Sequence, residues 1–269
     1  MALRLSSSLP EDNPGRFDEK VGDLSSHLAE LRSRLLRCCC YAAVGMGAMW
    51  LLSHPLFMVL FAPVQKALRE LPVATPGLPA GLPVVSNFTD PFFIQLQISL
   101  VGGLILAAPF VMAELWAFIV PALTASEKRA VMLVGPLSVV LFLAGVGCAY
   151  LVMPAAVGFF LGYLGNIPGA VLLQNPLTYI VFFVKLMLIF GLLFQLPVVL
   201  MFLGKIGLLR SEMMTKYWRQ CAVGLFTLAM VVAPSNDPIT MLALAVPLTL
   251  LFFASIWLVR LVEPKGAVG

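Results

Sequence analysis

The chain has 269 residues, of which 61% are hydrophobic and only 11% are charged, whereas soluble domains average about 45–50% apolar and about 25% charged residues. This composition, together with a mean hydropathy of +0.99, excludes a water-soluble globule. The net charge of +4 has to be judged from where the basic residues lie, because the cytoplasmic loops of membrane proteins collect Lys and Arg.

Six apolar stretches are candidates for crossing a bilayer, whose hydrocarbon core of about 30 Å requires about 20 helical residues. They cover residues 35–52, 92–118, 130–153, 178–203, 217–233 and 239–259. The sequence therefore predicts an all-α integral membrane protein with six transmembrane helices. We expect one membrane domain over residues 24–262, preceded by a polar tail of residues 1–23 and followed by a short tail of residues 263–269.

The distribution of basic residues predicts the orientation of these spans. The 17 lysines and arginines lie in the two tails, at the inner end of the first span and in the connections after the second and fourth spans, with three exceptions. The exceptions are Lys66, Arg69 and Lys185. We therefore expect a multi-pass protein of the cytoplasmic (inner) membrane with both termini in the cytoplasm. Because the basic excess is explained as a topology signal, we expect no nucleic-acid partner.

The first predicted element is an amphipathic helix that precedes the first span. Leu24, Leu28, Leu31 and Leu35 recur at spacings of four, three and four residues, which places them on one face of a helix. We expect this short helix to lie along the inner membrane surface and to lead into the first span.

Two connections are expected on the outer side, one before the second span and one after the third, and they differ in composition. Residues 53–90 carry six prolines, and the part from 55 to 71 is amphipathic but too short to cross the bilayer. It predicts an outer-surface helix followed by a Pro-rich extended segment. Residues 154–176 are uncharged and rich in Gly, so they predict a loop that caps the outer mouth of the bundle.

Four prolines lie inside predicted spans, namely Pro109, Pro136, Pro197 and Pro247. Each removes one backbone hydrogen bond and clashes with the carbonyl four residues earlier. In lipid such breaks persist only where neighbouring groups satisfy the freed carbonyls, so we expect kinked helices that form a concave bundle. The short fifth span reaches the sixth through residues 234–238, a tight outer hairpin that should thin the bilayer locally.

Three polar side chains lie in or near the spans. Gln195 needs a hydrogen-bond partner in hydrocarbon, either the carbonyl freed by Pro197 or a polar residue of another membrane protein, and the sequence leaves both open. For Lys185 we favour the interpretation that its side chain extends the ammonium group to the outer membrane interface. Glu114 lies near the inner boundary, where hydration is available, and is a secondary candidate for a site.

Two acids on the inner side are stronger candidates. Glu127 completes a capping box with Thr124 at the start of the third span, yet the same position faces the cytoplasm. Glu30 can pair with Arg34 four residues later, which is an ordinary intrahelical contact. Because the inner side is otherwise basic, the two acids together favour recognition of a positively charged partner.

Catalytic and metal-binding patterns are absent from the sequence. His27 and His54 are expected on opposite sides of the membrane, and no HExxH, GxSxG or Walker motif occurs, so we expect no enzyme. The five cysteines show neither CxxC spacing nor histidine partners, so no metal, disulfide framework or cofactor is expected. The run Cys38 to Cys40 fits small apolar filler better than acylation sites.

A small-solute or ion secondary transporter is the alternative from a different functional class. It is motivated by the kinked spans and by Gln195 and Lys185. Against it, the chain shows no inverted repeat of broken segments and no chain of buried ionisable groups, which transporters tend to have.

Five motifs along the chain are specific enough to carry a resemblance to a known family. They are HLAELRSRLL at 27–36, DPFF at 90–93, LILAAPFVMAELWAFIVPAL at 104–123 with the SEKR that follows, FGLLFQLPV at 190–198, and APSNDP at 233–238. Together they resemble the TatC family, the receptor core of the twin-arginine protein translocase, over residues 25–260.

The resemblance implies a function. It implies that the chain binds signal peptides bearing paired arginines and assembles with the single-span subunits TatA and TatB, and with copies of itself. The complex would move folded proteins out of the cytoplasm with the proton-motive force. A code of paired arginines is physically reasonable, because the rigid guanidinium fork suits carboxylates better than an ammonium does.

Carried over residue by residue, the resemblance also implies a signal-peptide-binding patch. The matching positions are Glu30, Arg32, Phe118 and Glu127. Most of the affinity should come from the apolar segment of the signal entering the concave bundle, because exposed ion pairs contribute only about 0–1 kcal/mol each.

Further positions match the family outside this patch. Pro63 and Asp237 match outer-side positions that are important for architecture. Gln195, expected to make an intramembrane contact with a partner, stands where the family often has a glutamate, so it keeps hydrogen bonding but has no protonation role. The usual glutamine after the outer hairpin is missing, with Met241 nearby.

Overall fold

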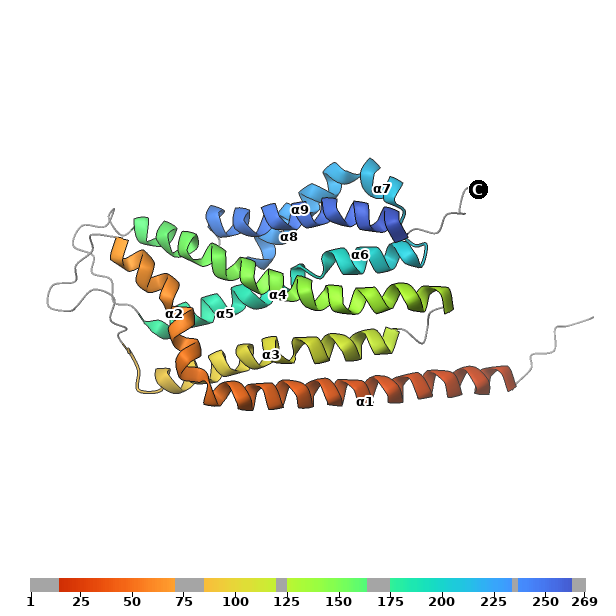
Figure 1. The fold of residues 1–269 in the computed structure, drawn as a ribbon, viewed down its shortest axis with the longest axis horizontal. Coiled ribbons are helices and arrows are strands. Elements are labelled where there is room, and N and C mark those ends of the chain that lie inside the picture. The colour runs from red at the N-terminus through yellow and green to blue at the C-terminus, as the bar shows by residue number, and fades with distance from the viewer. Residues whose placement is uncertain (1–14, 71–84, 120–124, 164–174, 234–236, 263–269) are drawn as a thin grey trace, which may run out of the picture.

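The structure, a computed structural model, describes residues 15–70, 85–119, 125–163, 175–233 and 237–262, with side chains over 28–66, 85–118, 134–163, 175–233 and 237–262. These residues form nine α-helices and no strand (Figure 1). The helices are α1 Gly15–Leu51, α2 Ser53–Glu70, α3 Asp90–Ile119, α4 Ala125–Gly162, α5 Pro176–Leu193, α6 Leu196–Lys205, α7 Ser211–Lys216, α8 Trp218–Val232 and α9 Pro238–Val262. The predicted all-α membrane fold is confirmed.

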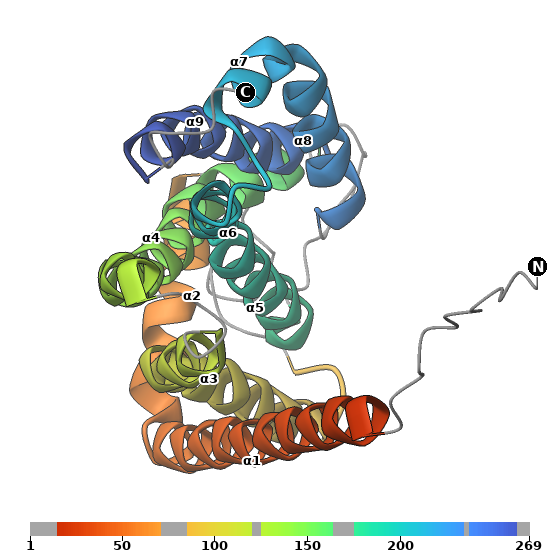
Figure 2. The same cartoon turned by 90° about the vertical axis from the view of Figure 1, so that its right-hand side faces the viewer.

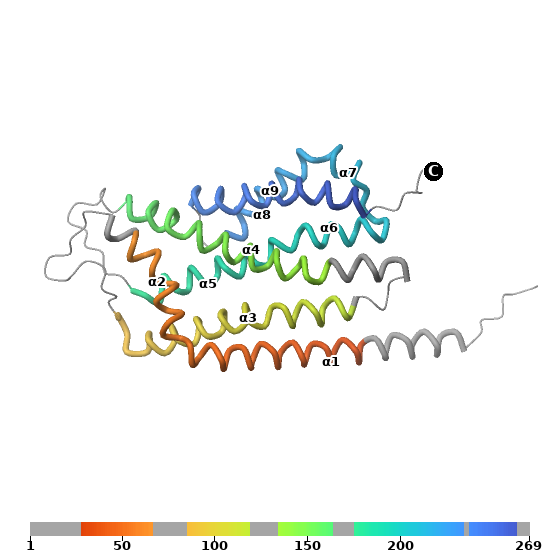
Figure 3. Tube along the Cα trace, viewed as in Figure 1, coloured from red at the N-terminus to blue at the C-terminus, as the bar shows by residue number. Residues whose placement is uncertain are grey.

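Four helical stretches are long and apolar enough to cross a bilayer. They are Asp90–Phe118, Val134–Gly162, Pro176–Lys205 and Pro238–Val262. α1 and α2 are bent by 81° at their junction and count together as one further candidate; the turn is visible in Figure 3. The apolar helix α8 is shorter. By length, the described residues therefore give four or five spans, and the full count of six remains a prediction.

The helices form an arc when viewed end-on (Figure 2). α1 and α3 lie together at one end of the arc, α7, α8 and α9 lie at the other, and α4, α5 and α6 lie between them. α2 turns away from the axis of α1 and packs on the end of α4. Of the four prolines expected to kink the spans, Pro197 follows an interruption between α5 and α6, whereas Pro109, Pro136 and Pro247 lie inside the continuous helices α3, α4 and α9.

The leading segment is not a separate surface helix as predicted. α1 runs unbroken from Gly15 to Leu51 and combines the expected amphipathic helix and the first span in one rod. The physical reason is that no proline or glycine lies between residues 23 and 44, so no backbone hydrogen bond is lost at the expected junction.

α4 also differs from its predicted extent. The third span was expected to end at residue 153, with a loop from 154 onward, but the helix continues to Gly162. Packing accounts for the extension, because Val157 and Leu161 lie against Phe61 and Val64 of α2. α2 therefore lengthens the helix against which it packs.

α1 and α3 approach one another through glycines. A Cβ atom on Gly45 would lie 2.5 Å from the carbonyl oxygen of Gly103, and one on Gly103 would meet the backbone of Met46. Small residues at helix contacts are the usual means of close packing in membranes. α4 and α5 use the same means, because a Cβ on Gly145 would lie 2.6 Å from the carbonyl oxygen of Phe190.

A buried carboxylate joins the N-terminal ends of α3 and α5, on the side that the sequence predicts to be outer. The Asp90 side chain accepts hydrogen bonds at Oδ2 from the backbone N–H of Asn87, at 3.1 Å, and from Nδ2 of Asn175, at 3.2 Å. The Asn175 side chain in turn accepts from the N–H of Leu177 at 2.9 Å and caps α5. Asp90 is only 2% exposed, and such a group is stable when hydrogen-bonded in this way.

Replacing Gly45 by Ala is expected to destabilise the protein by about 1–3 kcal/mol, because the added methyl group meets the backbone of α3 and not a flexible side chain. Gly47→Ala is the matched control, since a Cβ at Gly47 has nothing within 4 Å. The midpoint of thermal unfolding in detergent measures both. Equal midpoints for the two variants would contradict the close approach of α1 and α3.

Candidate functional site

A network of two acids and two arginines joins α1 to the C-terminal end of α3, at the end of the bundle that the sequence predicts to be cytoplasmic, the inner end. Arg34 donates from Nη2 and Nε to Oε1 of Glu30, at 2.7 Å and 3.0 Å, and from Nη1 to Oε2 of Glu114, at 3.1 Å. Nη1 of Arg37 lies 3.6 Å from Oε1 of Glu114. We call Glu30, Arg34, Arg37 and Glu114 the inner ion network.

The glycine contact sets the register of this network. Arg34 precedes Gly45 by eleven residues on α1, and Glu114 follows Gly103 by eleven residues on the antiparallel α3. Eleven residues are about three helical turns, or about 16 Å of rise. Arg34 and Glu114 therefore return to the faces that the glycines bring together, and they meet.

The four side chains of the inner ion network differ in their exposure to solvent. The side chain of Glu114 is 13% exposed and that of Arg34 is 19% exposed, whereas Glu30 is 38% and Arg37 58% exposed. Arg34 uses only Oε1 of Glu30, and within the described residues Oε2 of Glu30 has no hydrogen-bond partner. Glu114 is the most buried member of the network. Glu30 is an open carboxylate, meaning that solvent or a ligand can reach it.

The structure brings together only some of the predicted patch residues. Phe118 is half-buried in the last turn of α3 and shares a face with Glu114, because residues four apart are neighbours on a helix. Arg32 is exposed and, two residues from Glu30, does not face it. Glu127 belongs to the first turn of α4, and its side chain and the capping box lie outside the described side chains.

A second polar cluster links α3, α4 and the junction of α5 and α6. Nε1 of Trp116 donates to Oγ of Ser138 at 3.1 Å, and this hydroxyl donates to the Gly135 carbonyl oxygen at 2.8 Å. Nε2 of Gln195 donates to the backbone carbonyl oxygen of Ser138 at 3.0 Å. Ser138 is fully buried, so one residue holds three parts of the bundle together.

Gln195 thus has a partner that neither sequence interpretation named. It was expected to bond the carbonyl freed by Pro197 or a polar group of another protein. The helix is interrupted between Leu193 and Leu196, and the interruption turns the amide toward α4. Lys185 is exposed on the same face of α5 as Thr178 and Leu192.

The two predicted outer-side residues both act on backbone groups. Pro63 is buried inside α2 and has no N–H for the Val59 carbonyl oxygen; the Tyr150 hydroxyl of α4 donates to this oxygen at 3.1 Å. Oδ1 of Asp237 accepts from the N–H of Thr240 at 2.7 Å and so satisfies a free donor at the start of α9.

Sequence reasoning missed most of the inner ion network. Arg34 was considered only as an intrahelical partner of Glu30, and Arg37 was counted as a topology signal. The available signal was their spacing, because residues 30, 34 and 37 follow one helix face. With Glu114 at the inner boundary of the second span, that face predicts a contact between the two helices.

The comparisons with known proteins agree with this fold. A family model described as Sec-independent protein translocase protein (TatC) matches residues 26–247. The chain belongs to the TatC family. The TatC of Aquifex aeolicus is 35% identical over 249 residues, which cover 90% of this chain and 96% of that protein. The chloroplastic TATC of Pisum sativum is 37% identical over 254 residues, which cover 91% of this chain; the chain spans 65% of the length of the pea protein.

Solved structures of TatC also match the chain. A crystal structure of the twin-arginine translocase receptor TatC aligns with a TM-score of 0.68 at 31% identity, over 88% of this chain and 99% of that one. The crystal structure of this receptor in DDM gives a TM-score of 0.72 at 33% identity, over 86% and 98% of the two chains. Membership of the TatC family does not favour the alternative of a small-solute transporter.

Ser138→Ala is expected to lower stability by about 1 kcal/mol, because it leaves the buried Trp116 N–H without its acceptor while the backbone bond to Gln195 remains. Ser255→Ala is the matched control: Ser255 is equally buried, but it donates only to the Leu251 carbonyl of its own helix. Thermal unfolding in detergent compares them. A loss of stability in Ser255→Ala as large as that in Ser138→Ala would contradict the linking role of Ser138.

Proposed function

We propose that this chain is the receptor for twin-arginine signal peptides and the core of a translocase that exports folded proteins across the cytoplasmic membrane, driven by the proton-motive force. Family membership and the likeness to a twin-arginine translocase receptor support the proposal. The single observation that carries it in this chain is the open carboxylate of Glu30, which already binds a guanidinium at 2.7 Å.

Arginine exchange is the mechanism that we infer for recognition. An arginine of the signal replaces Arg34 at Glu30, and Arg34 stays paired with Glu114 at 3.1 Å. The exchange is inexpensive because no buried charge is left without a partner, which would otherwise destabilise strongly. The guanidinium fork fits the carboxylate at two points, whereas a lysine of the signal offers only a point charge.

Other residues of the patch have complementary roles in the proposal. Glu127 binds the second arginine of the pair, Phe118 contacts the apolar segment that follows it, and Arg32 contacts the polar start of the signal. The half-buried position of Phe118, on the face of α3 that carries Glu114, supports the second of these roles.

We place both termini, and with them the inner ion network, on the cytoplasmic side of the inner membrane, as the distribution of Lys and Arg favours. TatA, TatB and further copies of this chain are the partners that we propose. The role is binding and assembly, without catalysis or a cofactor. The transporter alternative loses part of its support, because the half-buried amide of Gln195 has a partner within the chain.

Glu30→Gln is expected to weaken binding of an Arg-Arg signal peptide about tenfold, because a charge-assisted bond is replaced by a neutral one. Binding of a Lys-Lys peptide should change less. Fluorescence anisotropy of labelled peptides with the purified protein measures both. Glu212→Gln, which removes an exposed acid on α7, is the control and should bind as the unmodified protein does; equal losses in both variants would contradict recognition at Glu30.

Arg34→Gln is expected to strengthen binding of the Arg-Arg peptide about threefold, because the competing guanidinium at Glu30 is removed. Arg37→Gln is the matched control: Arg37 pairs with Glu114 and not with Glu30, so this variant should leave the affinity unchanged. The same anisotropy titration measures both. A weaker peptide affinity in Arg34→Gln, with the fold intact by thermal unfolding, would overturn the exchange.

A further inference from the structure

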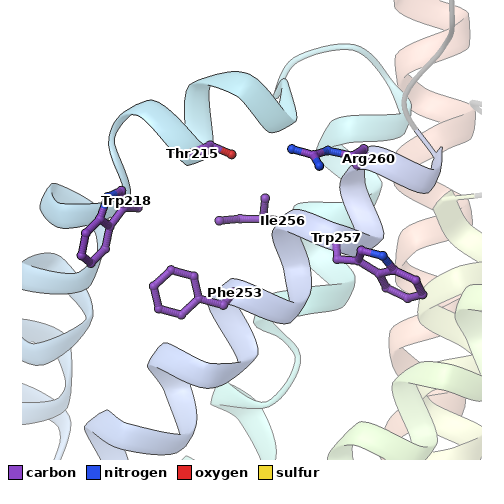
Figure 4. Close-up of a pocket in the computed structure, with 6 residues that line it drawn as sticks. All are labelled: Thr215, Trp218, Phe253, Ile256, Trp257 and Arg260. Atoms are coloured by element: carbon purple, nitrogen blue, oxygen red, sulfur yellow. The ribbon is translucent and has the colours of Figure 1, made fainter.

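A hollow of about 530 Å³ lies between α7, α8 and α9 (Figure 4). The inner ion network lies on α1 and α3, at the other end of the bundle in Figure 2. Its size is within the range of about 300–1,000 Å³ that is usual for ligand sites. It is lined by Thr215, Trp218, Phe253, Ile256, Trp257 and Arg260. Neither family membership nor the proposed receptor function assigns a ligand to it.

The floor of the hollow is apolar and aromatic. Phe253, Ile256, Trp257 and Arg260 follow one another at helical spacing along α9, so they form one face. The ring of Trp218 lies against that of Phe253 with centroids 5.8 Å apart. From Phe253 to Arg260 the helix rises about 10 Å, so an apolar chain lying along the hollow would extend from a charged end into the hydrocarbon.

The polar end of the hollow is positive. The guanidinium of Arg260 points across the hollow toward Thr215 (Figure 4), is exposed, and has no ion-pair partner among the residues that the structure describes. Two further basic residues follow the lining residues in the chain, Lys216 after Thr215 and Arg219 after Trp218. Their charged groups lie 5.5 Å and 5.6 Å from the ring centroids of Tyr217 and Trp218.

Thr215 adds a constraint on the head group. Its hydroxyl already donates to the Ser211 carbonyl oxygen at 2.8 Å, so it is left as a hydrogen-bond acceptor. A ligand that places an anion on Arg260 and a hydroxyl donor on Thr215 therefore fits better than a bare phosphate does.

We propose that this hollow is a binding site for an anionic phospholipid with a glycerol head group, phosphatidylglycerol. The phosphate binds Arg260, a head-group hydroxyl donates to Thr215, and an acyl chain lies over Ile256, Phe253 and Trp218. Basic pockets between helices on the cytoplasmic side commonly take anionic lipids, and Trp side chains are typical of the level of the head groups. A soluble anion would leave the aromatic floor unused.

The charge and the apolar floor do not depend on which peptide the protein binds, so the lipid proposal is separate from the receptor proposal. The test uses the full-length purified protein and native mass spectrometry, with phosphatidylglycerol or phosphatidylcholine of the same acyl chains as the probe. The unmodified protein should retain phosphatidylglycerol in preference to phosphatidylcholine.

Arg260→Gln is expected to lower the affinity for phosphatidylglycerol about fivefold, the share of one basic residue at an anionic surface, and to leave phosphatidylcholine retention unchanged. Arg260→Lys should have an affinity for phosphatidylglycerol between those of the unmodified protein and Arg260→Gln, because the charge remains and the guanidinium fork is lost. Lys66→Gln is the matched control, since it removes one exposed positive charge on α2 at the other end of the bundle, and it should bind as the unmodified protein does.

A second readout locates the bound lipid. Phosphatidylglycerol brominated on its acyl chains should quench tryptophan fluorescence more than brominated phosphatidylcholine does, and the difference should vanish in Trp218→Phe/Trp257→Phe. Equal retention of the two lipids, equal losses in Arg260→Gln and Lys66→Gln, or displacement of the lipid by millimolar inorganic phosphate would overturn the proposal. The last result would indicate a site for a soluble anion.

Discussion

The close approach of α1 and α3 at Gly45 and Gly103 is the contact on which the inner end of the molecule depends. In lipid, apolar side chains gain little by leaving one hydrocarbon environment for another, so helices associate through tight van der Waals packing and polar bonds. Two facing glycines provide the packing. They also fix the register of antiparallel helices, and three turns away that register brings Arg34 to Glu114.

The rest of the bundle is held by polar groups that each serve more than one helix. Ser138 binds Trp116 of α3 and Gln195 at the interruption between α5 and α6, and Asp90 with Asn175 joins α3 to α5 at the outer end. In hydrocarbon no water competes for these bonds, and a buried donor without its acceptor is costly. The helices therefore meet at fixed points, and the interruption beside Pro197 becomes part of the architecture.

The sequence predicts the helices well and the contacts between them poorly. Apolar length and proline positions anticipate α3, α5–α6 and α9, because each is a property of one segment. The extension of α4 was missed because it depends on α2 packing over it. Glu30 was found from its charge, but the bond from Arg34 to Glu114 was missed. The spacing of residues 30, 34 and 37 indicates a helix contact, and the glycine register then identifies Glu114, 80 residues away, as the partner of Arg34. Gln195 was known to need a partner, and only the fold identifies Ser138.

The sharp turn between α1 and α2 has a mechanical consequence. α1 packs mainly on α3, and at its outer end it continues through the 81° bend into α2. α2 is fastened to the bundle by the Tyr150 and Tyr179 hydroxyls, which donate to the carbonyl oxygens of Val59 and Leu60. The 37-residue rod is thus held in two ways, along α3 and through the bend by α2, so the positions of Glu30 and Arg34 depend on how α2 is seated on α4 as well as on α3.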